Sequence, residues 1–126
     1  MNKLIIDAAN DNIFLMIINN NNIYNITKEN TKTNYEKLTL IIHNFLKLNK
    51  FKIDDISVIY LNRGPGSFAG IRNSLSIVKA FNLTNGIDYY CYSFQDFEDE
   101  EDIKYENIPE LCKKYKIEKN LINPIY

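Results

Sequence analysis

The chain has 126 residues, of which 45% are hydrophobic, with nine Tyr, seven Phe and no Trp, and a formal net charge of −1. This length is enough for one domain with a real core and too short for a second full lobe. The balanced charge gives no compositional sign of a nucleic-acid binder. No apolar run approaches the ~18–20 residues of a membrane span, and no signal-peptide pattern occurs, so we expect a cytoplasmic protein with no membrane attachment.

The first third of the chain predicts three strands. Apolar runs at Leu4–Asp7, Ile13–Ile18 and Ile23–Ile26 have strand length, and four consecutive asparagines separate the second from the third. Asparagine tolerates positive φ and bonds its own backbone, so the Asn19–Asn22 tract is typical of a hairpin loop. We therefore expect an antiparallel meander.

A helix and a buried strand follow. Thr33 and Glu36 have the spacing of a capping box, and the apolar residues after them recur at helical intervals. Residues 56–61 then form an uninterrupted apolar run, which is typical of a strand buried on both faces and hence of parallel pairing.

A glycine-rich turn connects this strand to a second helix. Both arginines of the chain, Arg63 and Arg72, bracket it, and it holds three of the four glycines. Ser67 is a good N-cap for a helix of about 16 residues through Leu83, which Asn85 and Gly86 stop.

The last third predicts a fifth strand at Tyr89–Tyr92 and an acidic stretch at residues 96–106, which we expect to be a solvated loop. Pro109 then opens a short helix to about Tyr115, and residues 121–126 suggest an extended end. Cys91 and Cys112 have no CxxC spacing and are expected to be reduced core residues. The order of elements predicts an α/β domain of the ribonuclease-H-like kind, with a five-stranded mixed sheet and two main helices.

The turn itself allows two interpretations. Gly64 and Gly66 permit unusual backbone angles, Pro65 stiffens the turn, Ser67 caps the helix, and Gly70 allows close approach to another backbone. A glycine-rich turn at a helix N-terminus is also a possible anion site. However, no Lys-Ser/Thr pair follows the glycines as in a P-loop, so we favour a structural strand-to-helix elbow.

Taken together, Arg-Gly-Pro-Gly-Ser-Phe-Ala-Gly-Ile-Arg at residues 63–72 closely resembles the signature of the TsaB family, also called YeaZ. The resemblance covers residues 1 to about 94 and includes the opening strand, the first helix at residues 34–38 and the approach to the signature strand at residues 53–56. Asp7-Ala8-Ala9 stands where the family has Asp-Thr-Ser, and Ala69 stands where it usually has threonine.

The resemblance also suggests how the chain is divided. Residues 1–94 resemble the N-terminal lobe, the acidic residues 95–106 take the place of most of the family's second lobe, and residues 107–126 resemble the terminal helix and its Pro-x-Tyr ending. The expected protein is therefore a shortened form of the family.

This resemblance implies a fold of the actin-like ATPase superfamily and a role in making threonylcarbamoyladenosine in tRNA. It implies a non-catalytic scaffold subunit whose partner is a TsaD-type paralogue, joined by a TsaE-type ATPase. ATP and metal are expected on those partners, with no cofactor bound by this chain alone and with tRNA contacted indirectly.

Pairing in the family uses the two helices of this lobe. The second helix is apolar almost all round, with Phe68, Ile71, Leu75, Val78 and Leu83 on one predicted stripe and Ile77, Ala80 and Phe81 on the other, so it needs cover on both sides. The expected partner-binding residues are Leu38, Ile42, Phe68, Ile71, Arg72 and Leu75. The signature loop comprises Arg63, Gly64, Pro65, Gly66, Ser67 and Gly70. Arg63 is expected to close the strand end, and Arg72 to lie near the docking face.

Three alternatives remain. A homodimeric binding module that uses the same helices would have the same sequence pattern. A ribonuclease-H-like nuclease would use Asp7 and Glu36, but Asn62-Arg63 stands where a third carboxylate is needed. A peptidase would have to use His43, which no metal-binding or catalytic spacing supports. Direct tRNA contact could use six lysines, for which a solvated face is the default: Lys28, Lys32, Lys37, Lys47, Lys50 and Lys52.

Overall fold

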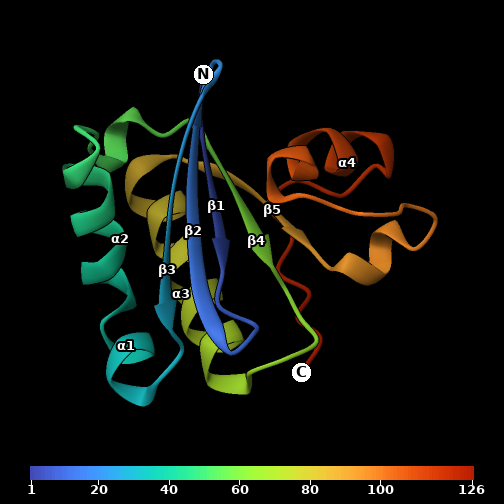
Figure 1. Cartoon of the computed structure of the whole chain (residues 1–126), viewed down its shortest axis with the longest axis horizontal. Helices are drawn as coiled ribbons and strands as arrows, with labels where there is room; N and C mark the ends of the chain where they lie inside the picture. Colours follow the sequence, from blue (N-terminus) through green and yellow to red (C-terminus); the bar gives the residue numbers. More distant parts are fainter.

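Five strands form one mixed sheet in the order β3-β2-β1-β4-β5 in a computed structural model that describes all residues 1–126 (Figure 1). Strands β1 (Asn2–Asp7), β2 (Asn12–Asn19) and β3 (Asn22–Glu29) pair antiparallel. Strands β4 (Val58–Asn62) and β5 (Asp88–Tyr92) extend the sheet in parallel with β1. The predicted meander and the predicted parallel strand are both confirmed.

Three helices cover one face of the sheet (Figure 1): α1 (Lys32–Glu36), α2 (Leu38–Leu48) and α3 (Phe68–Asn85). The larger core lies beneath them. It joins Leu4, Ile6 and Ile59 of the sheet to Leu38 and Ile71 of the helices, all with no exposed surface. Alternating strand residues point to this face, as the pleat of a sheet requires.

The first helix begins two residues earlier than predicted. Thr31, not Thr33, is the N-cap, because its hydroxyl accepts a hydrogen bond of 3.2 Å from the Asn34 amide. Glu36 ends α1, and Lys37 separates it from α2. The predicted capping box is therefore wrong, because Thr31 offers an equivalent hydroxyl directly after β3.

Helix α3 begins as predicted and ends at Asn85, two residues later than predicted, and its buried stripe also differs. Ser67 accepts from the Gly70 amide at 3.2 Å, and Gly86 ends the helix in the left-handed conformation. Phe81, which was assigned to the outer side, is buried, whereas Leu83 is 73% exposed. The long helix keeps Phe81 over the sheet, while Leu83 lies near its exposed last turn.

The second face of the sheet is covered by the chain that follows β5. Short 3₁₀ turns at Phe94–Phe97 and Tyr105–Asn107 and helix α4 (Ile108–Lys114) pack there. Phe97 and Ile108 have no exposed surface, and they lie in a second core with Ile5, Tyr60 and Tyr92 of the sheet.

The acidic stretch is thus only partly the solvated loop that we expected, since Asp96 and the residues from Ile103 onward pack against the lobe. The division after residue 94 stays a prediction, but the residues after it pack on the same sheet, to which all five strands before it belong. No helix of the chain is long and apolar enough to span a bilayer.

Candidate functional site: the elbow and the helical face

The glycine-rich turn after β4 lies directly against the loop that follows β1. The Ser67 amide donates a 2.8 Å hydrogen bond to the Ala9 carbonyl. A Cβ atom on Gly66 would collide with the same carbonyl oxygen, and one on Gly70 would collide with the Ala8 carbonyl oxygen. Glycine at these two positions lets the turn and the first turn of α3 approach the β1 loop at backbone distance.

The Asp7 carboxylate connects the β1 loop to the residues at the start of the elbow. The Asp7 side chain is fully buried and accepts hydrogen bonds from the Ala9 amide (3.0 Å), Asn10 Nδ2 (3.2 Å), Asn62 Nδ2 (3.1 Å) and the Tyr105 hydroxyl (2.6 Å). Asn62 in turn accepts from the Gly64 amide at 2.9 Å. The carboxylate therefore ties the end of β1 to the start of the elbow.

Tyr105 brings the C-terminal segment into the same network. Its ring stacks on Phe14 with centroids 4.0 Å apart, and burial, followed by the nearby Asp7 carboxylate, raises the pKa of its hydroxyl. The phenol therefore stays protonated and donates to Asp7. No sequence signal linked Tyr105 with Asp7, which lie 98 residues apart.

Arg63 connects the other side of the elbow to two later parts of the chain. Its guanidinium lies 2.8 Å from an Asp96 carboxylate oxygen and donates to the Asn123 carbonyl at 3.0 Å. Its own carbonyl accepts from the Ile125 amide at 2.8 Å. The strand end, the acidic stretch and the chain end meet at this one side chain.

We expect Arg63 and Asp96 to be energetically coupled. Both side chains are mostly buried, with exposures of 15% and 21%, so their ion pair is screened less than a surface pair. A double-mutant cycle of Arg63→Gln and Asp96→Asn, measured by urea unfolding, should give a coupling energy of about 1–2 kcal/mol. A coupling within error of zero would show that the pair does not fasten the elbow.

Three of the six amides between Gly64 and Gly70 are used within the chain. The amides of Gly64, Ser67 and Gly70 already donate to Asn62, Ala9 and the Ser67 hydroxyl. An empty phosphate cradle would present such amides outward. The geometry therefore favours the structural elbow over the anion site.

The six predicted partner-binding residues divide into two groups. Leu38, Ile42, Ile71 and Leu75 are at most 5% exposed, because they pack between the helices and the sheet. No partner can reach these four side chains in the folded chain, so their assignment to the docking face is corrected. Phe68 is 55% exposed and Arg72 is exposed, and the Arg72 guanidinium lies over the Phe68 ring, 5.5 Å from its centre.

Other exposed residues extend the surface that Phe68 and Arg72 begin. Leu40 of α2 is 56% exposed, and Ser76, Ala80 and Leu83 follow Arg72 along α3 at helical spacing. His43 contributes from α2, with its ring edge-on to Phe81 at 5.8 Å. We call this set the helical face: Leu40, His43, Phe68, Arg72, Ser76, Ala80 and Leu83. Of this set, Phe68 and Arg72 were predicted from the sequence as partner-binding residues.

The residues of the nuclease alternative do not form its site. Asp7 is buried beneath Tyr105, whereas Glu36 is exposed at the end of α1. No group of three His, Cys, Asp or Glu side chains is placed to share a metal ion. The geometry gives this alternative no support.

The two thiols are also unsuited to nucleophilic chemistry. Cys91 and Cys112 are each 2% exposed, and burial is the main cause that raises the pKa of both to about 12. Only the thiolate is reactive, and roughly one thiol in 10⁴ is ionised at pH 8 for such a pKa. We expect neither cysteine to react with Ellman's reagent in the native protein at pH 8, and both to react in 6 M guanidinium chloride. Fast native labelling would contradict the described burial.

The chain is similar in sequence to two known proteins. No family model matches the sequence. The chain is 33% identical over 69 residues to the tRNA threonylcarbamoyladenosine biosynthesis protein TsaB of Buchnera aphidicola subsp. Baizongia pistaciae, covering 55% of this chain and 31% of that protein. It is 27% identical over 90 residues to TsaB of B. aphidicola subsp. Schizaphis graminum, covering 71% of this chain and 43% of that protein. The chain thus spans less than half the length of these relatives.

Solved structures share the fold at low sequence identity. YeaZ from Pseudomonas aeruginosa matches 73% of this chain and 43% of its own, with a TM-score of 0.67 and 15% identity. RuvC from Thermus thermophilus, in complex with a Holliday junction substrate, matches 99% of this chain and 83% of its own, with a TM-score of 0.53 and 11% identity.

The sheet order, the crossover helices and these neighbours define a single lobe of the ribonuclease-H-like, actin-like ATPase fold. Within that class, the chain is similar in sequence to two TsaB proteins over part of its length, and similar in fold to YeaZ.

Proposed function

We propose that this chain is a non-catalytic scaffold subunit that docks on a TsaD-type enzyme and supports threonylcarbamoyladenosine modification of tRNA. The relatives' names supply the process. The observation that supports docking is the apolar exposure of the helical face. Leu40, Phe68 and Leu83 lie on neighbouring helices, and each is more than half exposed to solvent. Such apolar exposure on adjacent helices is typical of an interface.

The elbow would set the direction of this face. Helix α3 begins at Phe68, directly after the turn that Asp7, Asn62 and Arg63 hold in place. A rigid start fixes the angle at which Arg72, Ser76, Ala80 and Leu83 meet a partner. Binding then requires little rearrangement, which lowers its entropic cost.

The same geometry supports the proposal that ATP, metal and the TsaE-type ATPase belong to the partner side of the complex. Half of the amides of the elbow donate within the chain, and the chain's own Tyr105 covers Asp7. In this proposal, tRNA reaches the modification site through the catalytic subunit.

Leu83→Asp combined with Ser76→Arg should abolish binding to the TsaD-type protein of the same organism. Leu83 is 73% exposed and Ser76 is exposed, so the folded chain should lose no more than about 0.5 kcal/mol. Two charges in an apolar interface should weaken binding at least 100-fold, which is about 2.7 kcal/mol. The measurement is calorimetric titration of the purified proteins.

Leu121→Asp provides the matched control, since Leu121 is 41% exposed and lies in the C-terminal segment. It should bind as the parent chain does. Equal binding by the double variant would remove the helical face from the interface. If the parent chain instead forms a dimer of itself that the same double variant dissociates, the homodimeric alternative replaces the scaffold proposal.

A further inference from the structure

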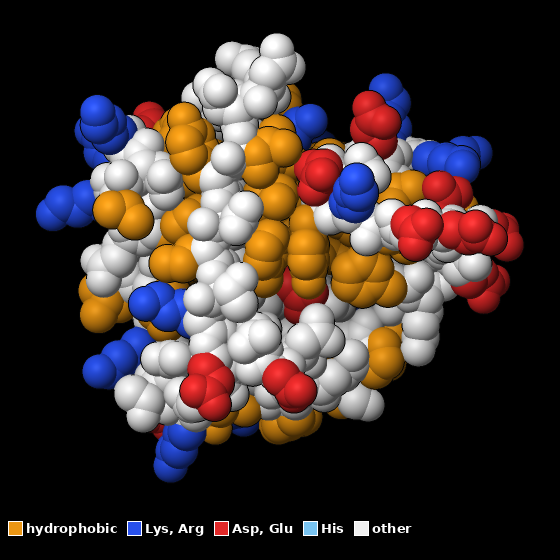
Figure 2. Space-filling model, in the orientation of Figure 1, with side chains coloured by type: hydrophobic (Ala, Val, Ile, Leu, Met, Phe, Trp, Pro, Cys, Tyr) orange, Lys and Arg blue, Asp and Glu red, His pale blue; other side chains and the backbone are white.

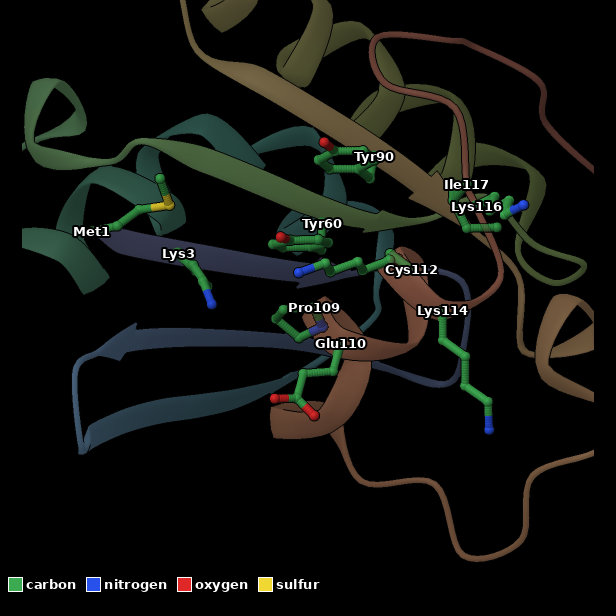
Figure 3. A pocket seen from close by; sticks show the side chains of 11 residues that line it. Met1, Lys3, Tyr60, Tyr90, Pro109, Glu110, Cys112, Lys114, Lys116 and Ile117 are labelled. Atoms are coloured by element: carbon green, nitrogen blue, oxygen red, sulfur yellow. The ribbon is translucent and has the colours of Figure 1, made fainter.

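A basic hollow lies on the sheet face opposite the helical face. It has a volume of about 870 Å³ and is bounded by β1, β4 and β5 on one side and by α4 and the chain after it on the other (Figure 3). Its lining includes Lys3, Tyr60 and Tyr90 of the sheet, and three lysines at or just after the end of α4: Lys113, Lys114 and Lys116. This volume lies within the range of small-molecule sites, about 300–1,000 Å³.

The charge of the hollow is strongly unbalanced. Four lysines line it against one carboxylate, Glu110, although the whole chain has a net charge of −1. Lys114 pairs with Glu100 at 2.8 Å, but Lys3, Lys113 and Lys116 form no ion pair. Three unpaired cations around one hollow repel one another and attract an anion.

Two tyrosines add hydrogen-bond donors. Tyr60 and Tyr90 are partners across β4 and β5, and their rings stack at 5.4 Å with an interplanar angle of 13°. Their hydroxyls lie at the same end of the two rings (Figure 3), and neither forms a hydrogen bond within the chain. Burial raises the pKa of Tyr60 to about 12, so its hydroxyl stays protonated and can donate to an anion.

We propose that this hollow binds consecutive phosphate groups of a single-stranded nucleic acid, for which an oligoribonucleotide serves as the probe. The three unpaired lysines come from β1, from α4 and from the turn after α4, so their charges are spread along the hollow instead of meeting at one point. Such spacing suits a chain of phosphates better than a single ion.

A flat anionic membrane fits this surface poorly. The acidic stretch lies beside α4, and Figure 2 shows Asp and Glu side chains gathered at that edge of the molecule. Glu101 and Asp102 are exposed there and would approach an extended anionic surface together with the lysines. A flexible strand can enter the hollow and avoid them.

The site goes beyond the proposed function and does not depend on it. The hollow lies with the second core, beneath α4, whereas the helical face lies over the first core, outside α2 and α3. Loss of one binding activity can therefore be measured while the other is intact.

The test is fluorescence anisotropy with a 5′-fluorescein-labelled 12-nucleotide oligouridylate between 50 and 300 mM KCl. The triple variant Lys3→Gln, Lys113→Gln, Lys116→Gln should bind at least ten-fold more weakly than the parent chain. The slope of log affinity against log salt should fall by about 2, since each phosphate contact on a single strand contributes about 0.7.

The control is Lys28→Gln, Lys47→Gln, Lys50→Gln, which removes three exposed lysines from β3 and from the end of α2. It should bind within about two-fold of the parent. Equal weakening of both triple variants, or no binding by the parent at 50 mM KCl, would overturn the proposal.

Two further experiments test whether the tyrosine hydroxyls contribute to binding and whether the bound phosphate belongs to a polynucleotide or to a small molecule. Tyr60→Phe with Tyr90→Phe should weaken binding three- to ten-fold with the salt slope unchanged, because hydroxyl donors are lost and no charge is. ADP and inorganic phosphate should displace the oligonucleotide only at millimolar concentrations. Displacement by micromolar ADP would show a free-nucleotide site and contradict the assignment to a single-stranded nucleic acid.

Discussion

Gly70→Ala is expected to lower the free energy of unfolding by about 3 kcal/mol, at the upper end of what one added methyl group costs in a packed site. The new Cβ would collide with the Ala8 carbonyl oxygen and approach Asn30 Nδ2, which itself donates to that oxygen at 2.9 Å. A backbone atom cannot move aside as a side chain can, so α3 has to shift away from the β1 loop. The corresponding fall in melting temperature is about 10 °C.

Gly86→Ala is the control for this substitution. Gly86 has a φ of 66° at the end of the same helix, but a Cβ there meets nothing within 4 Å. Its cost should be only the ~1 kcal/mol of a left-handed alanine. Equal effects of the two changes in thermal unfolding would show that close packing of the elbow contributes nothing.

Asp7→Ala is expected to be equally destabilising, by about 3 kcal/mol. The substitution removes the acceptor of four hydrogen bonds and leaves Asn62 Nδ2 and the Tyr105 hydroxyl without that partner in a buried site. It also frees Asn62, which holds the Gly64 amide at the start of the elbow. Urea unfolding, followed by far-UV circular dichroism, measures the loss.

Two control variants are expected to lower the free energy of unfolding by less than Asp7→Ala does. Asp11→Ala changes an exposed carboxylate on the same loop and should cost less than about 0.5 kcal/mol. Tyr105→Phe removes one of the four donors and should cost about 1 kcal/mol. If Asp7→Ala were as mild as Asp11→Ala, the carboxylate would not be the organiser of the elbow.

The predictions that held depended on local patterns. The asparagine turn, the Ser67 cap, the Gly86 stop and the apolar run at residues 56–61, most of which forms β4, each have a sequence signal with one physical meaning. The mixed sheet followed from their order. The cap at Thr31 was missed because two threonines two residues apart offer the same hydroxyl.

Predictions were less accurate where they depended on which other part of the fold covers a helix side chain. Apolar spacing identified α2 and α3 as amphipathic but could not show whether Leu38, Ile42, Ile71 and Leu75 face the sheet or a partner. The substitutions Leu75→Asp and Phe81→Asp would therefore test folding and not docking, because these two side chains are only 5% and 7% exposed. Exposed positions such as Ser76 and Leu83 test docking.

The contacts of the acidic stretch could not be predicted from its composition. Its composition indicates a solvated loop, yet Asp96 pairs with Arg63, and Tyr105 reaches Asp7 across the sheet. Contacts between residues 33 and 98 positions apart leave no trace in local composition. Residues of the acidic stretch thus hold the strand ends of the sheet in place.

The most direct test of the account is the mass of a mixture of this chain with the TsaD-type protein of its organism, measured by light scattering during size-exclusion chromatography. We predict a single complex whose mass is that of the partner plus whole copies of this 14.8 kDa chain. The Ser76→Arg, Leu83→Asp variant should elute apart from the partner. Separate elution of the parent chain and the TsaD-type protein at 50 µM each would contradict the scaffold proposal.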